Sequence, residues 1–135
     1  MPHDPADDDR AIRNLIATMA MVTDGGDLET YGSLLAEDAV WQMPGGEPVH
    51  GRDAIVESAR TRRAAGVLGP GSDTRHHVST IVVHVDGDTA SSQACWQFWG
   101  NASSGPVLRA IGRYEDTFRR TPEGWKYTSR KGIPG

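Results

Sequence analysis

The sequence predicts an α+β fold in which helices come first and an antiparallel sheet follows. Apolar residues recur at helical spacing in the first half of the chain, whereas the second half holds long alternating or β-branched runs separated by turns that contain Gly or Pro. One short strand lies between the helices and four consecutive strands come after them, so we expect a mostly antiparallel, strongly curved sheet. Such a sheet, wrapped around three helices, encloses a concave, mostly apolar cavity suited to a small molecule. The predicted helices cover 8–24, 28–36 and 52–66, and the predicted strands cover 38–43, 74–85, 89–100, 107–119 and 124–131.

Length and composition indicate one globular domain. Hydrophobic residues make up 37% and charged residues 24% of the 135 residues, which suits a folded chain rather than a disordered one. We expect residues 1–6 to be a disordered lead-in and residues 7–135 to form a single domain. The formal net charge of −4 provides no electrostatic basis for binding nucleic acid.

The sequence shows no signal for export or for a membrane. The first ten residues are acidic and lack an apolar run, and no segment approaches the roughly 18 consecutive apolar residues that a membrane span needs. The one cysteine, Cys95, excludes an internal disulfide and suits a reducing compartment. We therefore expect a cytoplasmic protein with neither membrane nor nucleic-acid partners.

The first predicted helix ends at a carboxylate whose position is ambiguous. Asp7, Asp8 and Asp9 lie where a helix N-terminus favours negative charge, and Gly25-Gly26 ends the helix. At about 100° per residue, Asp24 lies only about 40° from Ala20, at the edge of the apolar stripe. Asp24 is thus either a carboxylate that leans into a cavity or a solvent-exposed residue at the end of a helix.

Two shorter helices and one strand come next. Asp27 can cap the second helix. The strand that follows, 38–43, is broken by Pro44-Gly45-Gly46, and the third helix begins after Gly51.

Two adjacent histidines, His76 and His77, open the strand that starts at Thr74. Asp86-Gly87 predicts a tight type I′ hairpin turn after it, and pairing outward from Val85 opposite Asp88 places His77 across from Trp96 and His76 across from Gln97. Neighbouring strand residues point to opposite faces, so only one of the two rings can enter a given pocket. In this register His77 lies on the more apolar face, unless a bulge near the start of the strand reverses the facing.

The strand over 107–119 alternates between an apolar and a charged face. Its apolar face holds Leu108, Ala110, Gly112, Tyr114 and Phe118. Arg113 on this strand and Arg130 on the last strand are interpreted as solvated charges.

Several short motifs occur in an order shared with a known family. They are Asp38-Ala39-Val40-Trp41, Gly51-Arg52-Asp53-Ala54-Ile55, Thr74-Arg75-His76-His77-Val78, Val85-Asp86-Gly87-Asp88-Thr89-Ala90, Gly112-Arg113-Tyr114-Glu115-Asp116 and Gly124-Trp125-Lys126-Tyr127. With Asp24 at the end of the first helix, this order resembles the SnoaL-like branch of the NTF2-like superfamily. These are cone-shaped α+β barrels that include scytalone dehydratase, polyketide cyclases and ketosteroid isomerase. The resemblance covers about residues 7–132 and implies the cone fold, with three N-terminal helices packed in the curved sheet.

The resemblance also implies a site. In dehydratase-like and cyclase members, an aspartate of the first helix faces a strand histidine across the pocket. Asp24 matches the aspartate and the Thr74–Val78 motif points to His76 as the histidine, while the hairpin register keeps His77 as a second candidate. Apolar and aromatic side chains that could line the pocket are Trp41, Met43, Trp96, Phe98 and Tyr114.

The chain departs from scytalone dehydratase itself. Thr23 stands where that enzyme has a tyrosine before its aspartate, and no second histidine occurs between Thr89 and Gly100. A metal site on the histidine strand is disfavoured, since His76 and His84 lie about 26 Å apart along one face. No cofactor is expected.

These observations predict a cofactor-independent acid–base enzyme of the dehydratase, isomerase or cyclase type, that is, a lyase or isomerase. Its ligand would be a small, largely apolar cyclic molecule. The alternative is a non-catalytic ligand-binding or assembly domain with the same fold. Since related cone folds often pair through the outer sheet surface, we expect a homodimer, with Val78, Val82 and Cys95 on the pairing face.

Overall fold

The computed structural model describes residues 3–135, which form three helices and a six-stranded sheet. The order along the chain is α1 (Pro5–Gly25), α2 (Leu28–Ser33), β1 (Leu35–Gln42), β2 (Val49–His50), α3 (Arg52–Ala64), β3 (Arg75–Asp86), β4 (Thr89–Gly100), β5 (Val107–Thr121) and β6 (Gly124–Pro134). The sheet order is β2-β1-β6-β5-β4-β3. Every pair in it is antiparallel except the parallel pair β1–β6. The predicted α+β class and curved, mostly antiparallel sheet are confirmed.

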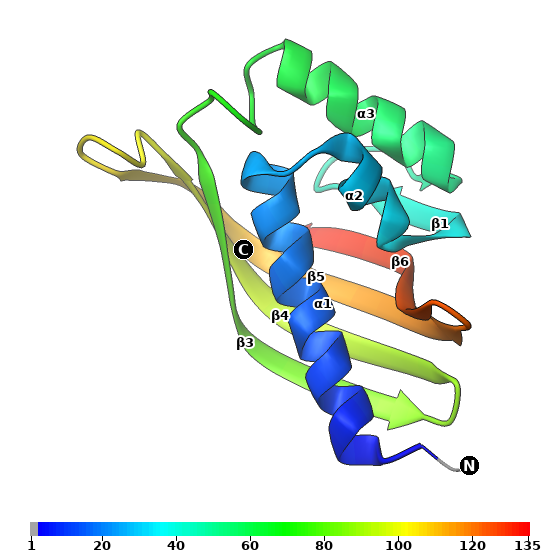
Figure 1. The fold of residues 1–135 in the computed structure, drawn as a ribbon. Helices are drawn as coiled ribbons and strands as arrows, with labels where there is room; N and C mark the ends of the chain where they lie inside the picture. Colours follow the sequence, from blue (N-terminus) through cyan, green and yellow to red (C-terminus); the bar gives the residue numbers. More distant parts are fainter. Residues whose placement is uncertain (1–2) are drawn as a thin grey trace.

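The helices cover one face of the sheet. Figure 1 shows α1 running diagonally across the curved strands, with α2 and α3 stacked beyond its C-terminal end over β1. α1 packs mainly along β3, and α3 packs against β1 and α2. The end of α1 therefore lies close to the start of β3, which brings Asp24 and the two histidines into the same region.

Several element bounds differ from those predicted by a few residues, and one short strand was not predicted. α1 begins at Pro5, capped by the Asp4 side chain, so it starts inside the expected lead-in; residues 1–2 lie outside the described part of the chain. α2 ends at Ser33 because the backbone N–H of Tyr127 donates to the Leu34 carbonyl, which starts the parallel pairing with β6. The short strand β2 was not predicted, since it consists of only two residues beside a loop rich in Pro and Gly.

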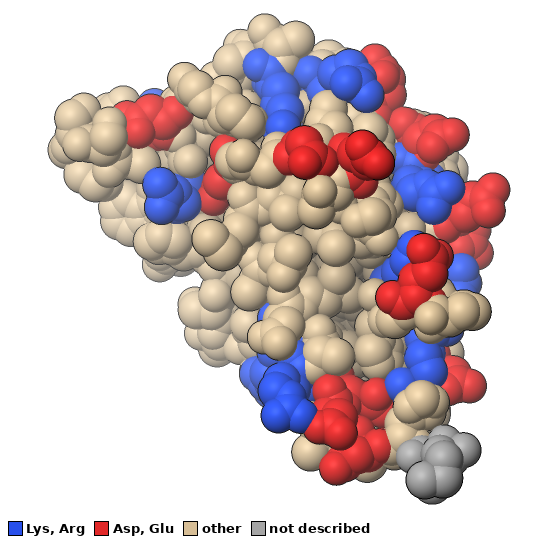
Figure 2. Space-filling model, in the orientation of Figure 1, with Lys and Arg blue, Asp and Glu red and all other residues tan. Residues whose placement is uncertain are grey.

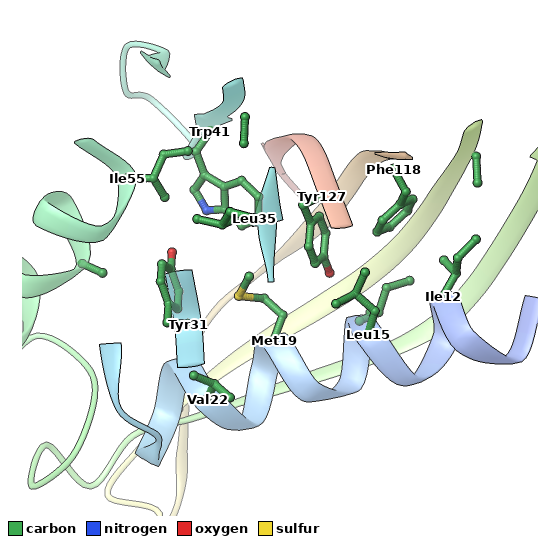
Figure 3. Close-up of a cluster of buried hydrophobic side chains, with 14 residues drawn as sticks. Ile12, Leu15, Met19, Val22, Tyr31, Leu35, Trp41, Ile55, Phe118 and Tyr127 are labelled. Carbon is green, nitrogen blue, oxygen red and sulfur yellow. The ribbon is translucent and has the colours of Figure 1, made fainter. Parts of the chain in front are cut away.

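The core lies between α1 and the concave face of the sheet. Ile12, Ile16 and Met19 of α1 are completely or almost completely buried, as are Phe118 and Tyr127 of the sheet. Figure 3 shows Ile12, Leu15 and Met19 of α1 facing the strands, with Tyr31, Trp41 and Ile55 grouped at the other end of the cluster. Burial of about 1.5–3 kcal/mol per large apolar side chain makes this cluster the main source of stability.

A β-bulge in β3 changes the predicted register. Ser79 pairs with Cys95 and Val82 with Gln93, so two residues of β3 lie opposite one residue of β4. The extra residue is Thr80, whose φ of 55° lies in the left-handed region that a β-branched residue seldom adopts. The bulge reverses the facing of the strand, so Val78 points inward rather than onto the expected pairing face.

The hairpin turn also differs in detail. Asp86 pairs with Thr89 and Val85 with Ala90, so the two loop residues are Gly87 and Asp88. Gly87, at the first loop position, has a φ of 61°, as in a type II′ turn, whereas a type I′ turn needs positive φ at both positions. This turn and the bulge together make the predicted cross-strand pairs wrong: His76 lies opposite Phe98 and His77 opposite Gln97.

Charged side chains are mixed over the surface. Figure 2 shows acidic and basic residues interspersed around this face of the molecule, with an uncharged band between them. Among residues 3–135, no helix is long and apolar enough to cross a membrane.

Candidate active site

Asp24 and His76 form a hydrogen-bonded pair where α1 meets β3. The His76 ring nitrogen Nδ1 lies 2.6 Å from Oδ1 of Asp24, and the His76 backbone N–H donates to Oδ2 at 2.8 Å. Only 10% of the Asp24 side chain and 13% of the His76 side chain are exposed. Two bonds to one carboxylate fix the ring plane, and they leave Nε2 as the nitrogen that can meet a ligand.

The bulge at Thr80 decides which histidine enters the site. His76 lies on the inner face, whereas His77 is exposed on the outer face, with its ring centroid 6.4 Å from that of Trp99. Alternation alone places His77 on the more apolar side, and that inference is wrong because one extra strand residue reverses the facing.

The end of α1 is held by an arginine from α3. Arg63 donates to the backbone carbonyls of Val22 at 2.8 Å and Gly26 at 2.7 Å. The Val22 carbonyl also accepts from the Gly26 backbone N–H at 2.9 Å, so Arg63 is its second donor, and a guanidinium at the end of a helix also complements the helix dipole. Arg63 therefore holds the backbone on both sides of Asp24.

His76 borders two hollows. The outer one is an open depression of about 630 Å³ between the end of α1, the 69–73 loop and the start of β3, and Asp24 and His77 also line it. The inner one is a cavity of about 200 Å³ between the helices and the sheet. Among residues 3–135, His76 alone lines both, so its ring lies at the boundary between the exposed depression and the interior.

The predicted lining residues divide into two groups. Trp41, Met43 and Tyr114 line the inner cavity. Trp96 instead donates its ring N–H to the Arg113 carbonyl at 3.1 Å and packs on Tyr114. Phe98 lies against the His76 ring, with 4.7 Å between centroids, and supports that ring from the neighbouring strand.

A buried ion pair forms part of the cavity wall. Arg130 donates to Asp116 through Nε at 2.9 Å and Nη2 at 3.0 Å, and Nη2 also donates to the Tyr127 hydroxyl at 2.9 Å. The side chains are 6% and 0% exposed, so the interpretation of Arg130 as a solvated charge was wrong. Asp116 lies between Tyr114 and Phe118 in the alternation of β5, and this position was the available signal for its burial.

Protonation states follow from this burial. Burial is the largest single influence and lowers the pKa of Arg130, but Asp116, Tyr127 and Tyr114 together outweigh it and raise that pKa overall, so the guanidinium stays charged. Burial raises the pKa of Tyr31 and of Tyr114. Both phenols are therefore neutral at physiological pH and can donate hydrogen bonds into the cavity.

Metal ligands do not cluster here. Within residues 3–135, no group of three or more His, Cys, Asp or Glu side chains is placed to hold a metal ion.

The fold and the site together define the class. A curved sheet in this strand order, with α1 across its concave face and an aspartate–histidine pair at the cavity, is an NTF2-like cone. The sequence matches the SnoaL-like domain family over residues 4–131, so the chain belongs to that family.

Solved structures agree with this assignment. The chain is similar to an NTF2-like protein with a cystatin-like fold from Novosphingobium aromaticivorans, with 30% identity and a TM-score of 0.83 over 96% of this chain and 82% of that one. It is similar to a proposed aromatic ring hydroxylase from the same organism, with 28% identity and a TM-score of 0.81 over 98% and 92% of the two chains. A proposed NTF2-like dehydratase from Streptomyces avermitilis shares the fold, with 22% identity and a TM-score of 0.83 over 97% and 99%. Among curated proteins, none matches the sequence significantly.

Proposed function

We propose that this protein is a cofactor-independent acid–base enzyme of the dehydratase, isomerase or cyclase type, acting on a small cyclic molecule. The observation that carries the proposal is the Asp24–His76 pair, with Nδ1 of the ring 2.6 Å from the carboxylate beside the inner cavity. A ring oriented in this way by a buried carboxylate is a recurring device for proton transfer. The proposed dehydratase among the similar structures is consistent with this chemistry.

Each group has a defined role in the proposed reaction. Nε2 of His76 removes a proton from a carbon next to a carbonyl, and the Asp24 carboxylate stabilises the imidazolium that forms. The same imidazolium then protonates a leaving hydroxyl, in dehydration, or another carbon of the enolate, in isomerisation. The neutral hydroxyls of Tyr31 and Tyr114 line the same cavity and can donate to the oxygen on which negative charge develops.

Deuterium exchange tests the proposal whichever product the reaction yields. Cyclic ketones and hydroxy-ketones are incubated with the enzyme in D₂O, and exchange or elimination is followed by proton NMR. We expect His76→Ala and Asp24→Asn to lower the rate for any active compound by about 10²–10⁴-fold. His77→Ala is the matched control and should stay near the wild-type rate, since its ring is exposed on the outer face.

Thermal melts of each variant separate a lost catalyst from a lost fold. Full turnover by folded Asp24→Asn and His76→Ala proteins would overturn the proposal. A compound that binds in the cavity without exchange or elimination in the wild-type protein would favour the non-catalytic binding domain.

A further inference from the structure

Two arginines line the cavity that the acid–base pair borders, and the proton transfer described above uses neither. Arg62 comes from α3 and Arg130 from β6, and both side chains line the inner cavity together with His76. A cation in a cavity wall is costly unless an anion balances it. The partners of each arginine therefore indicate what the cavity is built to hold.

Arg130 is balanced but retains donors. Its Nε and Nη2 bind Asp116 and Tyr127. A guanidinium has five N–H donors, and the two on Nη1 take part in none of these bonds. The Tyr114 ring lies over the guanidinium, 3.7 Å from its Cζ, so the Nη1 edge of this almost fully buried group is the part left for a ligand.

Arg62 has no carboxylate partner within the described chain. No Asp or Glu among residues 3–135 lies within ion-pair distance of its guanidinium, and its Nε is buried without a hydrogen-bond acceptor. Leaving a buried donor unsatisfied costs about 1–3 kcal/mol. Of the neighbouring arginines of α3, Arg60 pairs with Glu57. The Nε of Arg63 is also buried without an acceptor, but its two Nη atoms bind the carbonyls of Gly26 and Val22.

Nearby acidic groups do not supply the missing anion. Burial raises the pKa of Tyr31, and Arg62 and Arg130 act in the opposite direction, which places this neutral phenol close to both cations. Asp116 is bound to Arg130, and Asp24 is bound to His76. Glu47 borders a second chamber of about 180 Å³ beyond Arg62 but forms no ion pair with it. Within residues 3–135, the positive charge of the half-buried Arg62 therefore has no carboxylate partner at the cavity.

We propose that the ligand of this cavity is a small cyclic monocarboxylate whose carboxylate group binds between Arg62 and Nη1 of Arg130. The forked geometry of guanidinium groups suits a carboxylate, and each charge-assisted bond is about twice as strong as a neutral one. Trp41, Met43 and Leu68 provide the apolar walls for the ring. This refines the expectation of a largely apolar ligand. Where this proposal identifies the ligand as the substrate of the acid–base pair, it rests on the proposed function.

Matched pairs of acids and amides test the carboxylate directly. Benzoate, cyclohexanecarboxylate and 2-naphthoate are each compared with the corresponding amide, and binding is measured by NMR titration at pH 7. We expect at least one acid to bind about ten-fold or more tightly than its amide. Arg62→Met should remove that preference and leave amide binding within about three-fold, because only the charge-assisted bonds are lost.

Arg60→Met is the matched control, since Arg60 lies on the same helix but its charge is exposed and paired with Glu57. It should leave acid binding unchanged. Thermal melts show whether Arg62→Met is folded, and Arg62→Lys, which keeps the charge without the fork, should retain part of the preference. Equal binding of every acid and its amide, the absence of any binding up to about 10 mM, or an acid preference that survives in Arg62→Met would each overturn the proposal.

The same titration in His76→Ala separates this proposal from the proposed function. The acid preference should persist there, because the arginines do not depend on the histidine. Binding of acids without any proton exchange would retain the carboxylate site and reject the acid–base reaction. Proton exchange of neutral compounds, without tighter binding of acids than of amides, would retain the acid–base reaction and reject the carboxylate site.

Discussion

Replacing Asp116 by asparagine should destabilise the fold strongly, because the Arg130 charge would stay buried without its counter-ion. The two N–H···O distances of 2.9 and 3.0 Å and the nearly zero exposure of both side chains describe a fully desolvated pair. At an effective dielectric constant of about 20, unit charges about 4 Å apart attract by about 4 kcal/mol. This agrees with the roughly 3–5 kcal/mol measured when one partner of a buried pair is removed.

Urea and thermal unfolding, followed by circular dichroism, measure this effect. For a domain of this length, a loss of about 3–5 kcal/mol corresponds to a fall in Tm of about 10–20 °C. The control is Asp38→Asn, whose carboxylate pairs with Arg119 in an exposed ion pair with side chains 71% and 44% exposed. That variant should melt close to the wild-type temperature.

A double variant tests the cause. Asp116→Leu combined with Arg130→Met removes both charges, so it should recover most of the stability that Asp116→Asn loses. A change below about 1 kcal/mol in Asp116→Asn, or a double variant less stable than Asp116→Asn, would refute the reasoning that an unbalanced buried charge dominates.

Three further outcomes are expected. Hydrogen bonds from Arg120 hold the pKa of Asp8 at about 2, below the ordinary 3.8, so its contribution to stability is present above about pH 4 and disappears as the pH falls through 2. The Tm difference between Asp8→Asn and wild type should therefore shrink over that range, and a constant difference would contradict it. Arg63→Met should lower the free energy of unfolding by about 1–3 kcal/mol in urea titrations, because the Gly26 carbonyl loses its side-chain donor and the Val22 carbonyl keeps only the Gly26 N–H; unchanged stability would show that the cap is dispensable. We expect a homodimer through the outer sheet face, where Val82 and Ile111 are about half exposed, and light scattering that shows a monomer at tens of micromolar would count against it.

Periodicity was sufficient to predict most of the fold. The apolar spacing of α1 and the long runs of β3 to β6 identify elements strongly enough that their bounds agree within a few residues. The short elements were harder to predict, because their structure depends on tertiary contacts. The early start of β1 requires the Leu34 carbonyl to bind the distant Tyr127 N–H, which no local pattern reveals.

The candidate site was predicted only in part. Asp24 and His76 match the family motif, but the alternation of β3 favoured His77. The bulge at Thr80 that reverses this facing could not be predicted, because a threonine does not indicate a bulge. The buried Arg130–Asp116 pair was missed because charged strand residues are usually solvated. The position of Asp116 on the apolar face of β5 was the feature of the sequence that could have predicted its burial.

Nitrogen-15 NMR of the histidine rings tests most directly the central claim, that Asp24 fixes the His76 ring and leaves Nε2 as the base. Spectra of the labelled wild-type protein are compared with those of Asp24→Ala, and His76→Gln and His77→Gln assign the signals. We predict that the neutral His76 ring carries its proton on Nδ1, and that this preference disappears in Asp24→Ala while the His77 signals stay the same. A neutral His76 ring protonated on Nε2 in the wild-type protein, or a His76 ring that does not respond to the loss of Asp24, would contradict the claim.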